Sequence, residues 1–194
     1  MKPFKIFKNL LDKYVVDEKS IKLLQHKWNE PHRKYHNEKH LEYVLNNIRN
    51  DFAFSASSEM EKTAVVLAAF FHDAVYDPIK KDNEDESIKF FKRIYRGNTT
   101  LGKYVADMIE CTKHRKVPLL RRNKILWNAD NHGFKDSFLK FKHVEMLIRE
   151  EFSMVPIEEY KEKRIEFLKL NIGLFGINGD SNIKKLIRWI EKTY

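Results

Sequence analysis

The sequence predicts an all-α protein that folds as a single domain over residues 1–194. Its 194 residues include only 5 prolines and 6 glycines, so few turns are signalled and long helices are favoured. Apolar residues recur three and four positions apart along most of the chain, which is the spacing of a buried helix face. No alternating apolar and polar runs indicate strands, and a chain of this length buries a substantial core.

Apolar spacing predicts three helices in the first quarter of the chain. The first spans Phe4–Tyr14, and the second begins with Ser20 as its N-terminal cap and ends before Pro31, because the residue preceding a proline avoids helical angles. Asn37 is expected to cap the third. The residues expected to face inward in the last two helices are Leu23, Leu24, Trp28, Leu41, Val44, Leu45 and Ile48.

The rest of the chain continues the helical pattern. A loop over Phe52–Ser58 precedes the central apolar stretch, and a polar connection from Asp77 leads into a helix over Glu84–Tyr95. Pro118 is expected to open a later helix that turns Leu119 and Leu120 inward, and Ile172–Asp180 is expected to be a glycine-rich loop. Further helices are predicted around Tyr104–Ile109, His143–Phe152, Tyr160–Leu168 and Ile183–Ile190.

Composition and charge indicate a globular protein with anionic partners. Lys and Arg number 37 against 28 Asp and Glu, a net charge of +9, which favours phosphorylated metabolites or nucleic acid. The acidic residues are interspersed, so a solvated surface also explains much of the excess. The lone Cys111 excludes an internal disulfide, and no signal peptide or membrane span is recognisable, so a cytoplasmic location without membrane contact is expected.

The stretch Ala64–Asp77 organises the candidate chemistry. It is apolar on every side for two turns, which predicts a buried helix, and it then reaches His72 and Asp73. Polar groups at the end of a buried helix must be hydrogen-bonded, paired or bound to a metal, unless they simply emerge into solvent. The pair therefore predicts either a metal site or an ordinary helix end.

His40 and Asp130 are the expected partners of this pair in a metal site. His32, His36 and His40 recur every fourth residue, and only His40 lies inside the third helix, on the edge of its apolar stripe. Asp130 follows an apolar segment on the inward side, although it would also serve as a turn residue. Two imidazoles with two carboxylates suit a divalent Mn, Fe, Co, Ni, Zn or Mg ion, with one or two ions per chain.

This ligand series resembles that of the HD-domain metal-dependent phosphohydrolase superfamily. The similarity includes a bacterial subgroup of predicted HD phosphohydrolases, through Pro31–His36, Phe71–Pro78, Asn83-Glu84 with Ser87, and a tail formed by Ile148–Phe152 and Arg164. The subgroup has Asp-Ala-Asp-Leu where this chain has Asn128-Ala-Asp130-Asn131, which keeps the ligand but alters its surroundings. The resemblance implies a helical HD-type fold and hydrolysis of a nucleotide or another small phosphate ester.

A second resemblance assigns roles around the metal. Tyr35–His40 is similar to the Tyr-His-Asn-x-x-His segment of mammalian cyclic-nucleotide phosphodiesterases, which implies that His40 binds metal and His36 gives a proton to the leaving group. The purine-clamping glutamine of those enzymes has no counterpart that can be placed here, so their substrate specificity does not carry over. Asp73, the other expected catalytic residue, has two oxygens and could bridge to a second metal.

Several neighbouring residues complete the expectations. His114 is the best extra metal ligand by composition, and Glu84 is expected either to orient a ligand or water or to complement its helix dipole. Phosphate binding is expected from the basic residues Lys113, Arg115, Arg121 and Arg122, unless they form an ordinary solvated face.

Two other functions remain open from the sequence. An HD-fold di-iron oxygenase would need additional histidine ligands, for which His114 is the best placed. A metal-stabilised module that binds nucleic acid would use the +9 charge. Against this module, the aromatic residues fall at core spacing and are not interleaved with Lys and Arg as a stacking platform requires. The sequence leaves the substrate, the metal and the oligomeric state open.

Overall fold

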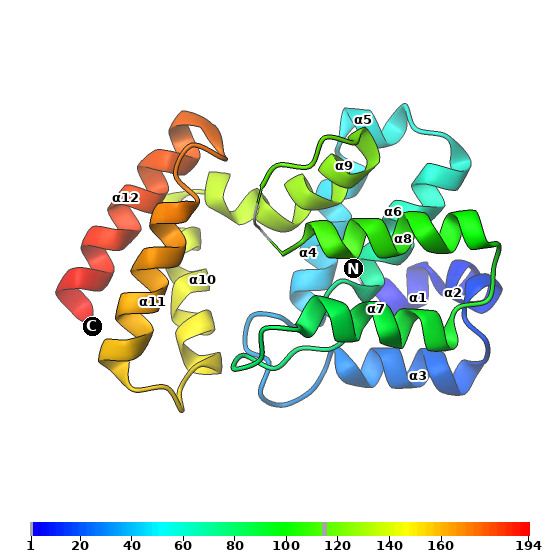
Figure 1. Cartoon of the computed structure of the whole chain (residues 1–194), viewed down its shortest axis with the longest axis horizontal. Coiled ribbons are helices and arrows are strands. Elements are labelled where there is room, and N and C mark those ends of the chain that lie inside the picture. Colours follow the sequence, from blue (N-terminus) through cyan, green and yellow to red (C-terminus); the bar gives the residue numbers. More distant parts are fainter. Residues whose placement is uncertain (1, 114–115) are drawn as a thin grey trace. The chain divides into compact units, whose positions relative to one another are not determined.

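A computed structural model describes residues 2–113 and 116–194, and over these residues it confirms an all-α fold (Figure 1). Two residues, Val15 and Tyr95, form an isolated antiparallel bridge, and the described residues contain no strand. The helices are α1 Pro3–Ile6, α2 Lys8–Tyr14, α3 Glu18–Lys27, α4 Glu38–Arg49, α5 Phe52–Ser55, α6 Glu59–Phe71, α7 Asn83–Ile94, α8 Thr99–Cys111, α9 Arg121–Asp130, the 3₁₀ helix η1 Asn131–Lys135, α10 Phe138–Glu151, α11 Ile157–Leu170 and α12 Gly176–Thr193.

The chain divides into two compact units, Met1–Asp130 and Asn131–Tyr194. The first contains α1 to α9 and is built around α6, which packs against α4, α7, α8 and α9. In the second, α12 packs against α10, α11 and η1. No helix among the described residues is both long enough and apolar enough to cross a bilayer.

The central helix α6 is buried as its composition predicts. Every residue from Ala64 to Phe71 is buried, and most of them are fully inaccessible. Ser58 and Glu61 form a capping box, in which each side chain bonds to the backbone N–H of the other residue and the first free N–H groups of the helix are satisfied. Trp28, also inaccessible, donates from Nε1 to the Phe70 carbonyl at 2.9 Å. The helix that leads to His72 is therefore fixed at both ends.

The N-terminal elements differ from the prediction in two ways. The expected first helix is broken at Phe7 into α1 and α2, and both Phe4 and Phe7 pack edge-on against Phe70, at 5.1 and 5.7 Å between ring centroids. The α3 cap is Asp17, not Ser20: the Asp17 carboxylate accepts from the Ser20 N–H at 2.7 Å. Leu23 is 41% exposed, so its inward assignment was wrong.

Three later boundaries also differ. The Phe52–Ser58 segment contains the short helix α5, capped by Asp51. Helix α9 begins at Arg121 and not at Pro118, and Leu119 and Leu120 point outward, at 92% and 49% exposure. The glycine-rich turn is shorter than expected, because Gly173 and Gly176 adopt positive φ angles, of 92° and 74°, and α12 already starts at Gly176.

A buried ion pair joins α10 to α11 in the second unit. Glu145 is inaccessible; its Oε1 accepts from the Tyr160 hydroxyl at 2.7 Å and its Oε2 from Arg164 Nε at 2.7 Å. Removing one member of such a pair leaves a buried charge poorly compensated and usually costs about 3–5 kcal/mol. The Arg164 side chain thus holds together two helices of this unit.

We expect Arg164→Met to lower the free energy of unfolding of the second unit by about 3–5 kcal/mol. Denaturant titration followed by circular dichroism and tyrosine fluorescence measures the loss. The neighbouring Lys163, whose side chain is 70% exposed and pairs with Glu159 on the surface, is the control. Lys163→Met should change stability by less than about 1 kcal/mol. Equal losses in the two variants would contradict a special role for the buried pair.

Candidate metal centre

His72 is placed by the end of α6. It is the C-terminal cap residue, its N–H bonds to the Ala68 carbonyl at 2.8 Å, and the residue is 1% exposed. Its Nδ1 lies 2.8 Å from the Ala69 carbonyl oxygen. Since a carbonyl only accepts, Nδ1 carries the hydrogen, and the other ring nitrogen, Nε2, is directed to the remaining groups of the site. This arrangement is typical of a metal-binding histidine, whose second nitrogen is usually held by a backbone carbonyl.

His40 approaches from the first turn of α4. The predicted cap is confirmed, because the Asn37 side chain accepts from the Lys39 N–H at 2.9 Å, and the helix then turns His40 inward to 4% exposure. Its Nε2 lies 3.4 Å from His72 Nε2. Two imidazole nitrogens at this distance share at most one hydrogen, so at least one of them presents a lone pair.

The carboxylates of Asp73 and Asp130 close the group. Asp73 Oδ2 lies 3.3 Å from His72 Nε2 and 3.8 Å from His40 Nε2. Asp130 Oδ1, from the last residue of α9, lies 3.1 Å from His40 Nε2 and 3.5 Å from His72 Nε2. The two carboxylates are only 17% and 8% exposed. All four residues belong to the first unit: His40, His72 and Asp73 form one cluster of possible ligand atoms, and Asp130 lies beside the two histidines.

The spacing of the His40, His72 and Asp73 atoms fits a shared divalent cation, and Asp130 lies close to both histidine nitrogens. Ligands bound at about 2.1 Å are about 3.0 Å apart at right angles and about 3.4 Å apart at the tetrahedral angle. The five distances above fall between 3.1 and 3.8 Å. His40, His72 and Asp73 by themselves offer three ligand atoms within 4.8 Å of one another. The mixed nitrogen and oxygen donors suit Zn and the other first-row metals.

The electrostatics of the site favour positive charge. Burial lowers the pKa of His72, but the negative charge of Asp73, the hydrogen bond and charge of Asp130, and the Ala69 carbonyl together raise this pKa to about 9. The metal-free site therefore holds a proton on His72 at neutral pH. A metal ion that uses Nε2 as a ligand must displace that proton.

This competition predicts a pH-dependent affinity for metal. Below a pKa of about 9 His72 is protonated, so the apparent dissociation constant should fall about tenfold for each pH unit gained and level off near pH 9. Isothermal titration calorimetry with Zn²⁺ or Mn²⁺ at several pH values, in buffers of different ionisation enthalpy, measures both the affinity and the proton released. An affinity independent of pH between 6 and 8 would contradict this exchange.

His36 lies beside the ligands in an aromatic cluster. Its ring stacks on Tyr76 at 4.2 Å and meets Tyr35 edge-on at 4.8 Å. Its centroid is 5.8 Å from that of His40. Unlike the buried His40 and His72, His36 is partly exposed, and His32 is exposed. This position, next to the ligands and reached by solvent, is suited to exchanging a proton with a bound molecule.

The remaining predicted site residues do not share one environment. Burial and, to a smaller extent, the negative charge of Asp73 raise the pKa of Glu84. Lys113 is held between Asp85 and Glu110, at 2.9 and 2.8 Å, so its charge is already offset. Arg121 donates to the Ala53 carbonyl, and the Arg122 guanidinium lies 4.0 Å from the Tyr104 ring centroid. His114 and Arg115 lie outside the described residues.

Sequence reasoning missed Arg33 and gave Tyr76 no role. Arg33 is 4% exposed although it lies in the loop between α3 and α4, where an arginine is usually on the surface. It donates to backbone carbonyls at His36, Asp73 and Ala74. The only signal in the sequence was its position between His32 and His36, which does not reveal a partner 40 residues away.

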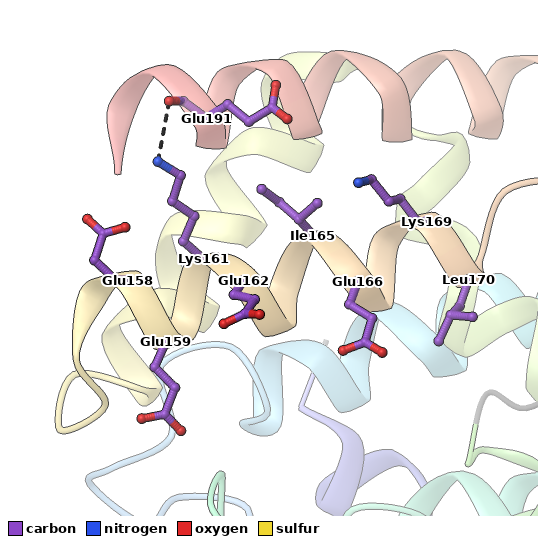
Figure 2. Close-up of a pocket in the computed structure, with 9 residues that line it drawn as sticks. All are labelled: Glu158, Glu159, Lys161, Glu162, Ile165, Glu166, Lys169, Leu170 and Glu191. Carbon is purple, nitrogen blue, oxygen red and sulfur yellow. Dashed lines mark hydrogen bonds between the residues drawn. The ribbon is translucent and has the colours of Figure 1, made fainter.

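The second unit has a groove along α11 with a different character (Figure 2). Its lining contains five glutamates, two lysines, Ile165 and Leu170, and Lys161 donates to the Glu191 carbonyl at 3.5 Å. The excess of carboxylates would repel an anionic substrate. A phosphorylated compound is therefore not expected to bind in this groove.

Comparisons with known proteins do not add to these observations. No protein-family model, no curated protein and no solved structure matches the chain. A functional assignment therefore depends on the side chains themselves and on the chemistry that they permit.

Proposed function

We propose that this protein is a metal-dependent phosphohydrolase of the HD type that cleaves a nucleotide or another small phosphate ester. The observation that supports the proposal is the cluster of His40, His72 and Asp73 at the buried end of α6, with Asp130 Oδ1 lying 3.1 and 3.5 Å from the two histidine nitrogens. His40 comes from α4, His72 and Asp73 from the turn at the end of α6, and Asp130 from α9; they are the four that the resemblance to HD phosphohydrolases selects.

These residues would hold the cation and leave His36 to handle a proton. The cation would supply a coordinated water of lowered pKa and polarise a phosphoryl oxygen. Asp73 and Asp130 contribute the two negative charges that a divalent ion needs. His36 gives a proton to the departing oxygen, since histidine is the commonest general acid in enzymes and this ring is partly exposed beside His40.

The charge of the chain supports an anionic substrate. A net charge of +9 attracts phosphates from solution, and the site itself has donors for a hard or borderline cation. Glu84 would add an oxygen ligand or orient a water if a second ion binds, because the negative charge of Asp73 is felt at its carboxyl group.

A substrate screen tests the proposal. The purified protein, stripped of metal and reloaded with Mn²⁺, Co²⁺, Ni²⁺, Zn²⁺ or Mg²⁺, is assayed against phosphomonoesters, cyclic nucleotides and nucleoside triphosphates. We expect metal-dependent release of phosphate or nucleotide from at least one class, abolished by chelation and restored by the metal. A metal-loaded protein that hydrolyses none of them would overturn the proposal. Bound iron with oxygen consumption would instead favour an oxygenase.

A further inference from the structure

Arg33 is a buried cation whose partners are almost all backbone carbonyls. Its side chain is fully inaccessible. Nη1 donates to the His36 carbonyl at 3.0 Å and to the Asp73 carbonyl at 2.7 Å, and Nη2 donates to the Ala74 carbonyl at 3.2 Å. Nε donates to Glu30 at 3.0 Å, which supplies the compensating charge. A buried guanidinium is tolerated only with such a set of partners.

These hydrogen bonds connect two segments that are far apart in the chain, at the backbone carbonyls of two residues of the candidate site. His36 and Asp73 are far apart in the chain, yet a single nitrogen of Arg33 bonds to both of their carbonyls. A planar guanidinium presents its N–H groups in a rigid fork, so it fixes the relative position of the carbonyls that it binds. The backbone before α4 is thereby aligned with the backbone after α6.

The same guanidinium also supports the His36 ring through Tyr76. Its central carbon lies 5.4 Å from the Tyr76 ring centroid and 5.8 Å from that of Trp28. Tyr76 in turn stacks on His36 at 4.2 Å, with 27° between the ring planes. His32 Nε2 lies 3.0 Å from the Tyr76 carbonyl oxygen, which further anchors this residue. Both the backbone and the ring of His36 therefore depend on Arg33.

We propose that Arg33 is a positioning residue, which holds His36 and Asp73 in register so that the His36 imidazole faces the metal-bound substrate. The assignment of a catalytic role to His36 rests on the proposed function. The placement of His36 by Arg33 does not, and it can be measured without any activity.

The matched control is Arg96. It too donates to three backbone carbonyls within the first unit, at Lys13, Val16 and Asp12, but none of these residues belongs to the site. Arg33→Lys and Arg96→Lys each remove a fork of hydrogen bonds to backbone carbonyls, a buried one beside the site and an exposed one elsewhere. Thermal unfolding of both variants reports any general loss of stability.

The first measurement is the NMR signal of the His36 ring, assigned by its disappearance in His36→Ala. In the wild type the stacked Tyr76 ring should shift this signal upfield of the position typical of an exposed histidine. We expect Arg33→Lys to move the signal toward the position of an exposed histidine, and Arg96→Lys to leave it in place. An unchanged signal in Arg33→Lys, or an equal change in both variants, would overturn the proposal whether or not the protein is a hydrolase.

The second measurement uses the substrate found in the screen. We expect Arg33→Lys to keep its metal and its KM within about threefold and to lose about 10–100-fold in kcat, the range seen when supporting hydrogen bonds of a site are removed. In a His36→Ala background the same change should cost less than about threefold, because Arg33 acts through His36. A full loss in that background would show that Arg33 acts by another route.

Discussion

Asp73→Ala is expected to abolish tight metal binding and, with it, hydrolysis. The Asp73 carboxylate lies 3.3 and 3.8 Å from the two histidine nitrogens, so its removal takes away a ligand and half of the negative charge of the four-residue site. Loss of one of four ligands in a buried site should weaken binding by at least the 10–100-fold that even supporting residues contribute. Metal content of the purified variant and calorimetric titration with Zn²⁺ measure the effect.

Asp85 is the control for this variant. Asp85 lies one residue from Glu84, pairs with Lys113 at 2.9 Å and is half-exposed, so Asp85→Ala removes an equal charge without removing a ligand. It should keep its metal and its affinity within about threefold. Wild-type protein without metal, and without binding on titration, would end the metal-centre hypothesis. Retention of metal by Asp73→Ala would remove Asp73 from the ligand set.

His36→Ala and His40→Ala are expected to fail in different ways. His40, at 4% exposure and with Nε2 in the ligand group, should lose metal when replaced. His36→Ala should keep the metal but reduce kcat by about 10²–10⁴-fold, the usual contribution of a general acid. Metal analysis and steady-state kinetics with a good and a poor leaving group separate the two roles.

The leaving group provides the decisive comparison for His36. A nitrophenolate departs without being protonated, whereas an alkoxide must be protonated as it departs. The defect of His36→Ala should therefore be much smaller on a nitrophenyl ester. The exposed His32, whose ring also stacks on Tyr76, is the matched control, and His32→Ala should retain most activity on both esters. If His36→Ala slowed both esters equally, His36 would be a positioning residue and not a proton donor.

The fold class could be predicted because it depends on local pattern, and the same pattern directed attention to the four candidate ligands. A helix that is apolar all round must be buried, and the two polar residues at its end must then meet partners, which pointed to His40 and Asp130. The Asn37 cap could also be predicted, since an asparagine before a periodic apolar stripe has a specific hydrogen-bonding role.

The sequence predictions were wrong where two local signals competed, and they missed a residue whose hydrogen-bond partners are distant in the chain. Asp17 and Ser20 are both good caps, and the earlier one starts α3. The apolar character of Leu119 and Leu120 suggested burial, but both residues precede α9 and are exposed. Arg33 could not be recognised, because its carbonyl partners at Asp73 and Ala74 are set by tertiary packing and leave no trace in side-chain type.

The complete burial of α6 also has a consequence for the timescale on which the site persists. Amide hydrogens in a helix surrounded by α4, α7, α8 and α9 exchange with solvent only when a large part of the unit opens. His72 bonds to this helix through its own N–H and through its ring, at the Ala68 and Ala69 carbonyls. Local fraying elsewhere in the unit therefore leaves His72 in place. We expect His72 to leave the site only when α6 itself opens.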